Sequence, residues 1–172
     1  AAGDFNEDGL QDIATANIFD NSISVRLNGL LSFYGTTEVP TGTSFGSVDV
    51  VIGDFNGDGN LDLAAANSWN SSVSIRLGDG LGGFSGTVNY PVGFNPRSLR
   101  VGDFNSDGKQ DIAAANYANT SNSVSVLLGA GSTITLEGNS APIINGSASP
   151  ITSNSTDFGS ICTNNNSVTQ TY

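Results

Sequence analysis

The sequence predicts an all-β fold made of tandem four-stranded units, and three observations support this prediction. A 15-residue stretch occurs three times, as GDFNEDGLQDIATAN from Gly3, GDFNGDGNLDLAAAN from Gly53 and GDFNSDGKQDIAAAN from Gly102. The copies are 50 and 49 residues apart, which indicates one supersecondary unit repeated along the chain. After each copy, apolar and polar residues alternate, which is the periodicity of a strand with one buried face.

The strands are expected in the same order in every unit. The runs IATAN, LAAAN and IAAAN are rich in alanine, but five residues before a polar break are too few for a stable helix. The alternating strands follow, as SISVRL (22–27), SVSIRL (72–77) and SVSVLL (123–128). A strand precedes the repeat in SVDVVIG (47–53) and SLRVG (98–102), and another ends the unit in LSFYGTTEV and GGFSGTVNYPV. Each complete unit therefore holds four short strands joined by tight turns.

Four antiparallel strands in about 40 to 50 residues are typical of a β-propeller blade. We therefore expect a partial β-propeller at residues 1–136, with repeats at about 1–47, 48–98 and 99–136. The first repeat is expected to hold only the end of its blade, the third to be a last or degenerate blade, and the ring to stay incomplete. Residues 137–172 are rich in Ser, Asn and Thr and contain two prolines, which indicates a connection rather than a core strand.

Oxygen-bearing side chains occupy the same places in every copy, in the pattern D-x-N-x-D-G-x-x-D. Ca²⁺ takes six to eight oxygen ligands, and a short loop surrounds the ion by presenting alternate side chains at positions 1, 3 and 5. Glycine at position 6 allows a positive φ, after which the carbonyl of position 7 can face the ion, and aspartate at 9 closes the site. About three Ca²⁺ ions are therefore expected, with ligands Asp4, Asn6, Asp8, Leu10, Asp12, Asp54, Asn56, Asp58, Asn60, Asp62, Asp103, Asn105, Asp107, Lys109 and Asp111, of which Leu10, Asn60 and Lys109 would bind through the backbone carbonyl.

The same residue types also occur in plain turns and in EF-hands. Asp, Asn and Gly form plain turns, but a plain turn does not require an aspartate at position 9 in three copies. An EF-hand begins in the same way, but it needs flanking helices and an acidic residue at position 12, where this chain has Thr15, Ala65 and Ala114. Calcium binding is therefore preferred. Because extracellular calcium modules bind at about 10⁻⁴ to 10⁻³ M, it favours a secreted or cell-surface location.

Composition limits the possible functions. The chain has 5 Lys plus Arg against 16 Asp plus Glu and a net charge of -11, which argues against nucleic-acid binding through a basic patch. No apolar run reaches the roughly 18 residues of a membrane helix, so no membrane insertion is expected. Histidine is absent and Cys162 is the one cysteine, which removes the serine triad, most zinc sites and an intrachain disulfide. We therefore predict no catalytic residue.

The stretch GDFNGDGNLDLAAAN, with the following SVSIRLGDGLGGFSG, resembles the FG-GAP or VCBS repeat of integrin-α-like β-propellers. The resemblance covers residues 1 to about 136 and implies calcium-binding loops between the first and second strands. The family's second motif is matched by GGFSG at Gly82, matched less well by SFYG at Ser32, and missing from the third copy. Family propellers commonly have seven blades, so the remaining blades of the same chain are implied as partners.

The C-terminal stretch STDFGSICTNNNSVTQTY resembles the opening strands of the Ig-like modules found in large bacterial surface proteins. This resemblance implies a bacterial surface protein, with the truncated start of an Ig-like domain in residues 137–172. A disordered linker is the alternative for the same residues.

The loops of a blade fall on two faces, and only one of them carries the calcium loops. The other face receives polar loops with aromatic side chains, which suit binding of sugars or peptides. Packing of the rings between blades is the alternative. Phe5, Phe55 and Phe104, inside the calcium loops, are expected to be core anchors. The possible ligand-binding residues are Phe19, Trp69, Tyr117, Phe94 and Arg97.

Together these features predict a noncatalytic adhesion or recognition module whose ligand is a glycan or an extracellular protein. The alternative is an accessory or scaffold portion of a secreted carbohydrate-active enzyme, a lyase or a hydrolase, because some of these enzymes are built on or beside similar propellers. The lack of histidine and of a paired set of carboxylates outside the loops favours the noncatalytic module.

Overall fold

The computed structural model describes residues 1–42, 46–117 and 122–129, together with four short strands nearer the C-terminus. Every regular element within these residues is a strand. No helix among them is long and apolar enough to span a lipid bilayer. The prediction of an all-β fold is confirmed.

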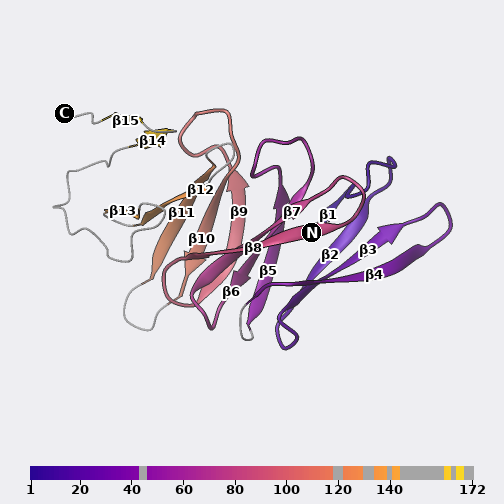
Figure 1. Ribbon diagram of the computed structural model, residues 1–172. Coiled ribbons are helices and arrows are strands. Elements are labelled where there is room, and N and C mark those ends of the chain that lie inside the picture. Colours follow the sequence, from indigo (N-terminus) through magenta and orange to yellow (C-terminus); the bar gives the residue numbers. More distant parts are fainter. Residues whose placement is uncertain are drawn as a thin grey trace.

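Three antiparallel sheets follow one another along the chain and stand side by side as a fan (Figure 1). The first sheet (blade 1) contains β1 (Ala2–Gly3), β2 (Asp12–Asn17), β3 (Ser22–Asn28) and β4 (Phe33–Pro40). The second (blade 2) contains β5 (Ser47–Gly53), β6 (Asp62–Asn67), β7 (Ser72–Gly78) and β8 (Phe84–Pro91). The third (blade 3) contains β9 (Pro96–Gly102), β10 (Asp111–Asn116), β11 (Ser123–Gly129), β12 (Ile134–Gly138) and β13 (Ala141–Ile143). The sheets are blades of a β-propeller whose ring is not closed.

Some details differ from the sequence-based expectations. Blade 1 has a first strand after all, because the two residues of β1 pair with β2. The strand predicted at 98–102 begins at Pro96, and blade 3 has five strands. Near the C-terminus β14 (Ile161–Thr163) pairs with β15 (Asn166–Val168), while the prediction of an Ig-like start or a linker otherwise lies outside the described residues.

The hydrophobic core lies between the blades. One cluster joins blades 1 and 2 and contains Phe5, Ala14, Ile23, Val25, Val39, Val50, Leu63 and Ala65. The other joins blades 2 and 3 and contains Phe55, Ala64, Ala66, Val73, Ile75, Leu99, Ile112, Ala114 and Leu127. Each blade is therefore stabilised by burying a face against its neighbour, as expected for repeat proteins.

Strand β6 shows why the alanine runs are strands. Its side chains alternate between the two cores, with Leu63 and Ala65 toward blade 1 and Ala64 and Ala66 toward blade 3. All six residues of the strand are buried. Small side chains on both faces let neighbouring sheets pack closely, so the tertiary structure overrides the helical propensity of alanine.

The exposure of the phenylalanines in the acidic loops shows which blade faces are covered by a neighbouring blade. Phe5 and Phe55 are 3% and 2% exposed, as expected of core anchors, and the ring of Phe5 meets Phe84 of the next blade edge-on at 5.5 Å between centroids. The prediction for Phe104 was wrong, because this side chain is 51% exposed. The rings of Phe5 and Phe55 pack against the blade that follows their own. No further blade follows blade 3 in the described part of the chain, and the ring of Phe104 is left in solvent.

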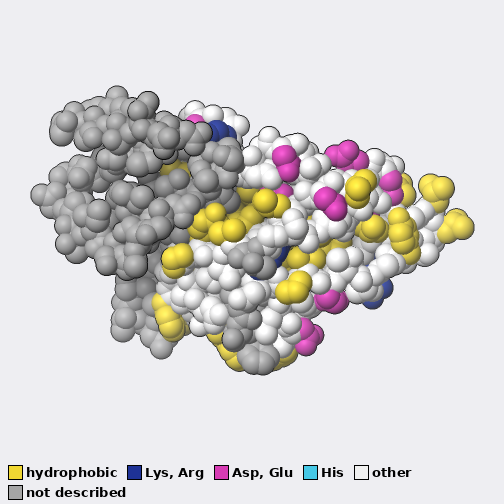
Figure 2. Space-filling model, viewed as in Figure 1, with side chains coloured by type: hydrophobic (Ala, Val, Ile, Leu, Met, Phe, Trp, Pro, Cys, Tyr) yellow, Lys and Arg dark blue, Asp and Glu magenta, His cyan; other side chains and the backbone are white. Residues whose placement is uncertain are grey.

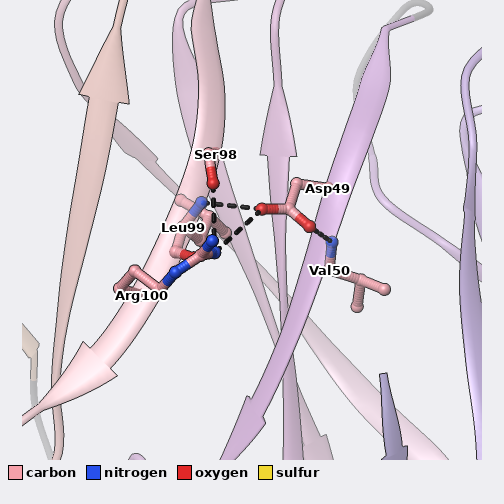
Figure 3. A network of polar contacts seen from close by, with 5 residues as sticks. All are labelled: Asp49, Val50, Ser98, Leu99 and Arg100. Carbon is pink, nitrogen blue, oxygen red and sulfur yellow. Dashed lines mark hydrogen bonds and ion pairs between the residues drawn. The ribbon is translucent and has the colours of Figure 1, made fainter.

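A side-chain network also joins the first strands of blades 2 and 3 (Figure 3). Asp49 Oδ2 accepts a hydrogen bond from the backbone N–H of Leu99 at 2.8 Å. The guanidinium of Arg100 lies 4.0 Å from the same oxygen and donates to Ser98 Oγ at 3.1 Å. Because the Arg100 side chain is 77% exposed, the ion pair contributes little, and the bond to the Leu99 N–H is the main contact.

The packing of the blades gives a direct test. Replacing Ala66→Leu adds three carbons to a fully buried position, and we expect it to lower the free energy of unfolding by about 1–3 kcal/mol through overpacking. Ala115 is the equivalent residue of blade 3 and is exposed, so Ala115→Leu should change stability by less than about 0.5 kcal/mol. Urea denaturation of both variants measures the difference, and equal effects would contradict the two-sided burial of β6.

Candidate metal centre

The three acidic loops lie at one edge of the fan, each between the first and second strands of its blade. They connect β1 to β2, β5 to β6 and β9 to β10, at the upper edge in Figure 1. Asp and Glu side chains gather over the loops of blades 1 and 2 along the same edge in Figure 2. The loops also contact neighbouring blades, since Gln110 accepts from the backbone N–H of Asp54 at 2.8 Å.

Two residues of each loop have a left-handed backbone. Position 6 has φ of +87°, +92° and +82° at Gly9, Gly59 and Gly108, as the pattern predicts. Position 4 is left-handed as well, with φ of 58° at Glu7 and 62° at Ser106. The sequence gives little sign of this second position, because only blade 2 has a glycine there. Side chains other than glycine are held at positive φ only where the surrounding contacts determine the conformation.

The carboxylate of position 1 organises the turn. Asp4 accepts the backbone N–H of Asp8 at 3.1 Å through one oxygen and that of Gly9 at 2.8 Å through the other. The same two bonds recur in blades 2 and 3, at 3.1 and 3.0 Å on Asp54 and at 3.1 and 2.9 Å on Asp103. This carboxylate therefore faces the centre of the loop in all three copies.

Positions 3 and 5 complete the turn in the same way in each blade. In blade 2, Asn56 donates to Asp58 Oδ2 at 2.8 Å and its own amide oxygen accepts the Asp58 N–H at 2.9 Å. Asp58 Oδ1 accepts the N–H of Asn60 at 2.8 Å. The equivalent bonds are present in blades 1 and 3. The predicted side-chain ligands at positions 1, 3 and 5 are thus brought together in one turn.

The aspartate at position 9 has a role that the sequence pattern does not reveal. Asp62 is fully buried, and its two oxygens accept the backbone N–H groups of Phe55 and Gly78, both at 2.9 Å. Asp12 does the same with Phe5 and Asn28, and Asp111 with Phe104 and Gly129. This carboxylate ties the start of the loop to the end of the third strand, whether or not it also contacts a metal ion.

The donor set fits a hard cation. Among the residues that the structure describes, no three His, Cys, Asp or Glu side chains converge closely enough to hold a metal ion by themselves. In each loop the third carboxylate is turned to backbone N–H groups, so the remaining donors are two carboxylates, an amide oxygen and backbone carbonyls. Oxygen donors without sulfur or imidazole suit Ca²⁺ rather than softer metals.

In blade 2 the pKa values of the exposed and the buried loop aspartate are shifted in opposite directions. Burial raises the pKa of Asp62 to about 6, against the opposing hydrogen bonds from Gly78 and Phe55, and the negative charges of Asp58 and Asp54 raise it further. The backbone N–H of Asn60 and the amide of Asn56 lower the pKa of Asp58. A cation in the loop would relieve the repulsion among these carboxylates.

The predicted ligand residues lie at the opposite edge of the fan. Phe19 and Phe94 are each 67% exposed, Trp69 is 62% exposed and Tyr117 is 51% exposed. Arg97 is exposed as well. These side chains come from the connections after the second and fourth strands and from the start of β9. Each of the four aromatic residues is more than half exposed, so none of them is fully buried between blades.

Hydrogen bonds between blades hold the loops of this second edge together. Gly46 donates to the carbonyl of Ile18 and accepts from the N–H of Ser68, both at 2.8 Å. Ser68 Oγ in turn donates to Asn95 at 2.6 Å. Since Trp69 follows Ser68, the ring is carried by a loop that is fixed to the connections on either side.

Sequence reasoning also missed a polar set that recurs in each blade. An asparagine ends the second strand and its amide contacts two serines at the start of the third, in Asn17, Ser22 and Ser24, in Asn67, Ser72 and Ser74, and in Asn116, Ser123 and Ser125. The sequence carries the signal, because every copy reads N followed by S-x-S. We call this set the Asn–Ser–Ser triad.

The buried and exposed aspartates of one loop are expected to behave differently. Asp62→Asn replaces one of two acceptor oxygens by an amide nitrogen, so one buried N–H loses its partner, and we expect a loss of about 1–3 kcal/mol of stability in the presence of a chelator. Asp58→Asn is the matched control, because Asp58 is exposed, and it should lose less than about 1 kcal/mol. Urea denaturation with chelator measures both, and similar losses would contradict the structural role of Asp62.

Comparison with known proteins agrees with this repeated geometry. A search of curated proteins gives no match. A model of the FG-GAP-like repeat matches residues 4–65 and again residues 54–114. Each match starts at position 1 of an acidic loop and runs through the next loop into the second strand of the following blade. Since the two matches together span more than half of the sequence, the chain belongs to the FG-GAP-like repeat family.

Proposed function

We propose that the chain is a calcium-binding β-propeller repeat module of a secreted or cell-surface protein, and that it recognises a glycan or an extracellular protein without catalysing a reaction. The observation that carries the proposal is the recurrence of one turn in three loops. The position 1 carboxylate, the position 3 amide and the position 5 carboxylate have the same hydrogen-bond partners in every blade.

The loop residues have distinct parts in this proposal. In blade 2 the side chains of Asp54, Asn56 and Asp58 and the carbonyl of Asn60 would hold the ion. Each oxygen of Asp62 already accepts one N–H, so Asp62 would contribute only through a remaining lone pair. Bound Ca²⁺ supplies two positive charges, which offset carboxylates that otherwise repel one another. Because the turn joins the first two strands of a blade, holding it rigid stabilises the whole blade.

The location follows from the calcium requirement. Three exposed loops of this kind resemble extracellular modules, which bind calcium at about 10⁻⁴ to 10⁻³ M. Such concentrations are found outside cells. The net charge of -11 also keeps the chain away from nucleic acid and anionic lipid, so a neutral, cationic or calcium-bridged ligand is favoured.

Recognition is assigned to the edge opposite the acidic loops. Aromatic side chains from all three blades stand exposed there among Asn and Ser residues. Ring faces stack on the apolar faces of sugars or on peptide side chains, and amides supply hydrogen bonds. Several shallow contacts across adjacent blades suit an extended ligand.

Calorimetric titration tests the calcium sites. We expect about three Ca²⁺ ions to bind the chain and to raise its Tm, because an ion held only by the folded state stabilises that state. Asp58→Ala should lower the stoichiometry by about one ion. Ser72→Ala, at the opposite end of the same blade, should leave it unchanged. Binding of about three ions by Asp58→Ala would contradict the ligand assignment, and no binding by a folded chain would contradict the proposal.

A second experiment tests the recognition edge. A panel of immobilised polysaccharides and extracellular matrix proteins is probed with the chain in millimolar calcium. For any ligand retained, Trp69→Ala is expected to weaken binding at least about tenfold, which corresponds to the loss of one well-packed aromatic contact. Leu81→Ala removes a side chain that is 79% exposed near the acidic loops and serves as the control. Equal binding by the two variants would contradict the assignment of ligand recognition to this edge of the blades.

A further inference from the structure

The acidic loops of blades 2 and 3 contact each other through Gln110. This residue is position 8 of its loop, between Lys109 at position 7 and the buried Asp111 at position 9. Its side-chain oxygen Oε1 accepts the backbone N–H of Asp54 at 2.8 Å. Because Asp54 is position 1 of the preceding loop, one side chain joins two of the loops to which calcium binding is assigned.

Both ends of this contact are held in place by their own blades. On one side, Asp111 accepts the N–H groups of Phe104 and Gly129 at 2.8 and 2.7 Å. The backbone next to Gln110 is therefore fixed to the end of β11. On the other side, the Gln110 amide packs so closely on the backbone of Gly53 that any larger residue there would collide with Oε1. The path from position 9 of the third loop to position 1 of the second is therefore short and closely packed.

The corresponding contact between blades 1 and 2 is apolar. Leu61 is position 8 of the second loop, and a methyl group added at Gly3 would lie 2.8 Å from its Cδ1. Leu61 therefore covers the start of the first loop as Gln110 covers that of the second. A leucine side chain has no oxygen that could accept the N–H of Asp4, so packing replaces the hydrogen bond at this place.

Blade 2 contacts the first loop at a second place that lies outside its own acidic loop. Gly82 donates its N–H to the carbonyl of Phe5 at 2.9 Å. It belongs to the turn between β7 and β8, so this bond does not pass through a predicted calcium ligand of blade 2. Position 8 is thus the place where the two pairs of loops differ in chemistry.

We propose that Gln110 couples the calcium sites of blades 2 and 3, so that an ion in the third loop raises the calcium affinity of the second. The proposal rests on the proposed function, since it concerns ions in the same loops. By thermodynamic linkage, an ion in the second loop raises the affinity of the third by the same factor. Because the coupling is carried by one hydrogen bond at the surface, we expect a factor of about two to five.

Ordering of the loops gives the coupling its sign. The carbonyl of Lys109 is one of the groups that would hold the ion of the third loop, and it immediately precedes Gln110. Fixing that carbonyl restrains the next residue, and with it the acceptor of the Asp54 N–H. The second loop then loses less conformational freedom when its own site is filled, which is positive coupling through entropy.

The charges of the loops act in the opposite direction. Each loop carries three aspartates at predicted ligand positions, so a cation in one loop weakens the negative potential at its neighbour. Glutamine and leucine are both uncharged. Exchanging them at position 8 therefore leaves this repulsion unchanged and isolates the effect of the hydrogen bond.

A double-mutant cycle on the whole chain tests the proposal. Asp107→Ala empties the third loop, and NMR titration of the amide signal of Gly59, whose N–H donates to Asp54, reports the calcium affinity of the second. With Gln110 present, we expect Asp107→Ala to weaken the second site about two- to fivefold more than in the Gln110→Leu background. Leucine fits at position 8, as Leu61 shows, so Gln110→Leu should remain folded.

Hydrogen exchange at the Asp54 amide gives a readout that is separate from affinity. With the second loop emptied by Asp58→Ala, calcium added to the chain fills the third loop without filling the second. We expect exchange of the Asp54 N–H to slow about two- to fivefold, because its acceptor on Gln110 is then held in place. Gln110→Leu should abolish this protection.

Leu61→Gln is the matched converse, because it supplies an acceptor for the Asp4 N–H. In this variant, emptying the second loop with Asp58→Ala should weaken the first site about two- to fivefold more than it does in the chain with Leu61. The amide signal of Gly9, which donates to Asp4 at 2.8 Å, reports the first site. Failure of Leu61→Gln to create coupling would contradict its assignment to this hydrogen bond.

The outcomes separate the coupling from the calcium sites themselves. Binding of calcium in all three loops with no dependence on residue 110 would overturn the coupling and leave the proposed function intact. A folded chain that binds no calcium would overturn both. A loss of coupling in Gln110→Leu, together with its gain in Leu61→Gln, would support the proposal.

Discussion

The rest of each blade depends on the two hydrogen bonds that the carboxylate at loop position 9 accepts. Asp12, Asp62 and Asp111 are buried, and each accepts two backbone N–H groups that are far apart in sequence. One N–H comes from the acidic loop and the other from the end of the third strand. A buried carboxylate without these partners would be costly, so the loop and the strand are held together as a pair.

This arrangement leaves the other loop carboxylates at the surface and preoriented. Asp54 and Asp58 need not support the blade, because Asp62 already does so. Their oxygens are instead positioned by N–H groups within the same short turn. A turn shaped in this way concentrates negative charge at one edge of each blade without burying it. The proposed calcium sites are therefore built on a turn whose side chains are already positioned by hydrogen bonds.

Packing between blades follows a second repeated rule. Blade 2 buries one face against blade 1 and the other against blade 3, and both contacts are made by strand β6. Polar contacts join the triads to the preceding blades, since Ser74 donates to the carbonyl of Thr41 and Ser125 accepts the N–H of Gly93. Ile13 and Phe104 lie on the outer faces of blades 1 and 3 and are exposed. The equivalent residues of blade 2, Leu63 and Phe55, are buried. The described chain is thus an open arc of three blades.

Much of this organisation was determined by local sequence. The repeat spacing, the alternation in SVSIRL and the D-x-N-x-D-G pattern predicted the strands, the blades and the positive φ at loop position 6, because these depend on side chains close together in the chain. The environment of Phe104, the two N–H partners of Asp62 and the role of the Asn–Ser–Ser triad were decided only by the tertiary structure. Phe5, Phe55 and Phe104 occupy the same G-D-F-N stretch, and the buried rings differ from the exposed one in having a following blade among the described residues. Burial depends on contacts between residues that are distant in sequence, and no local pattern records which of those neighbours is present.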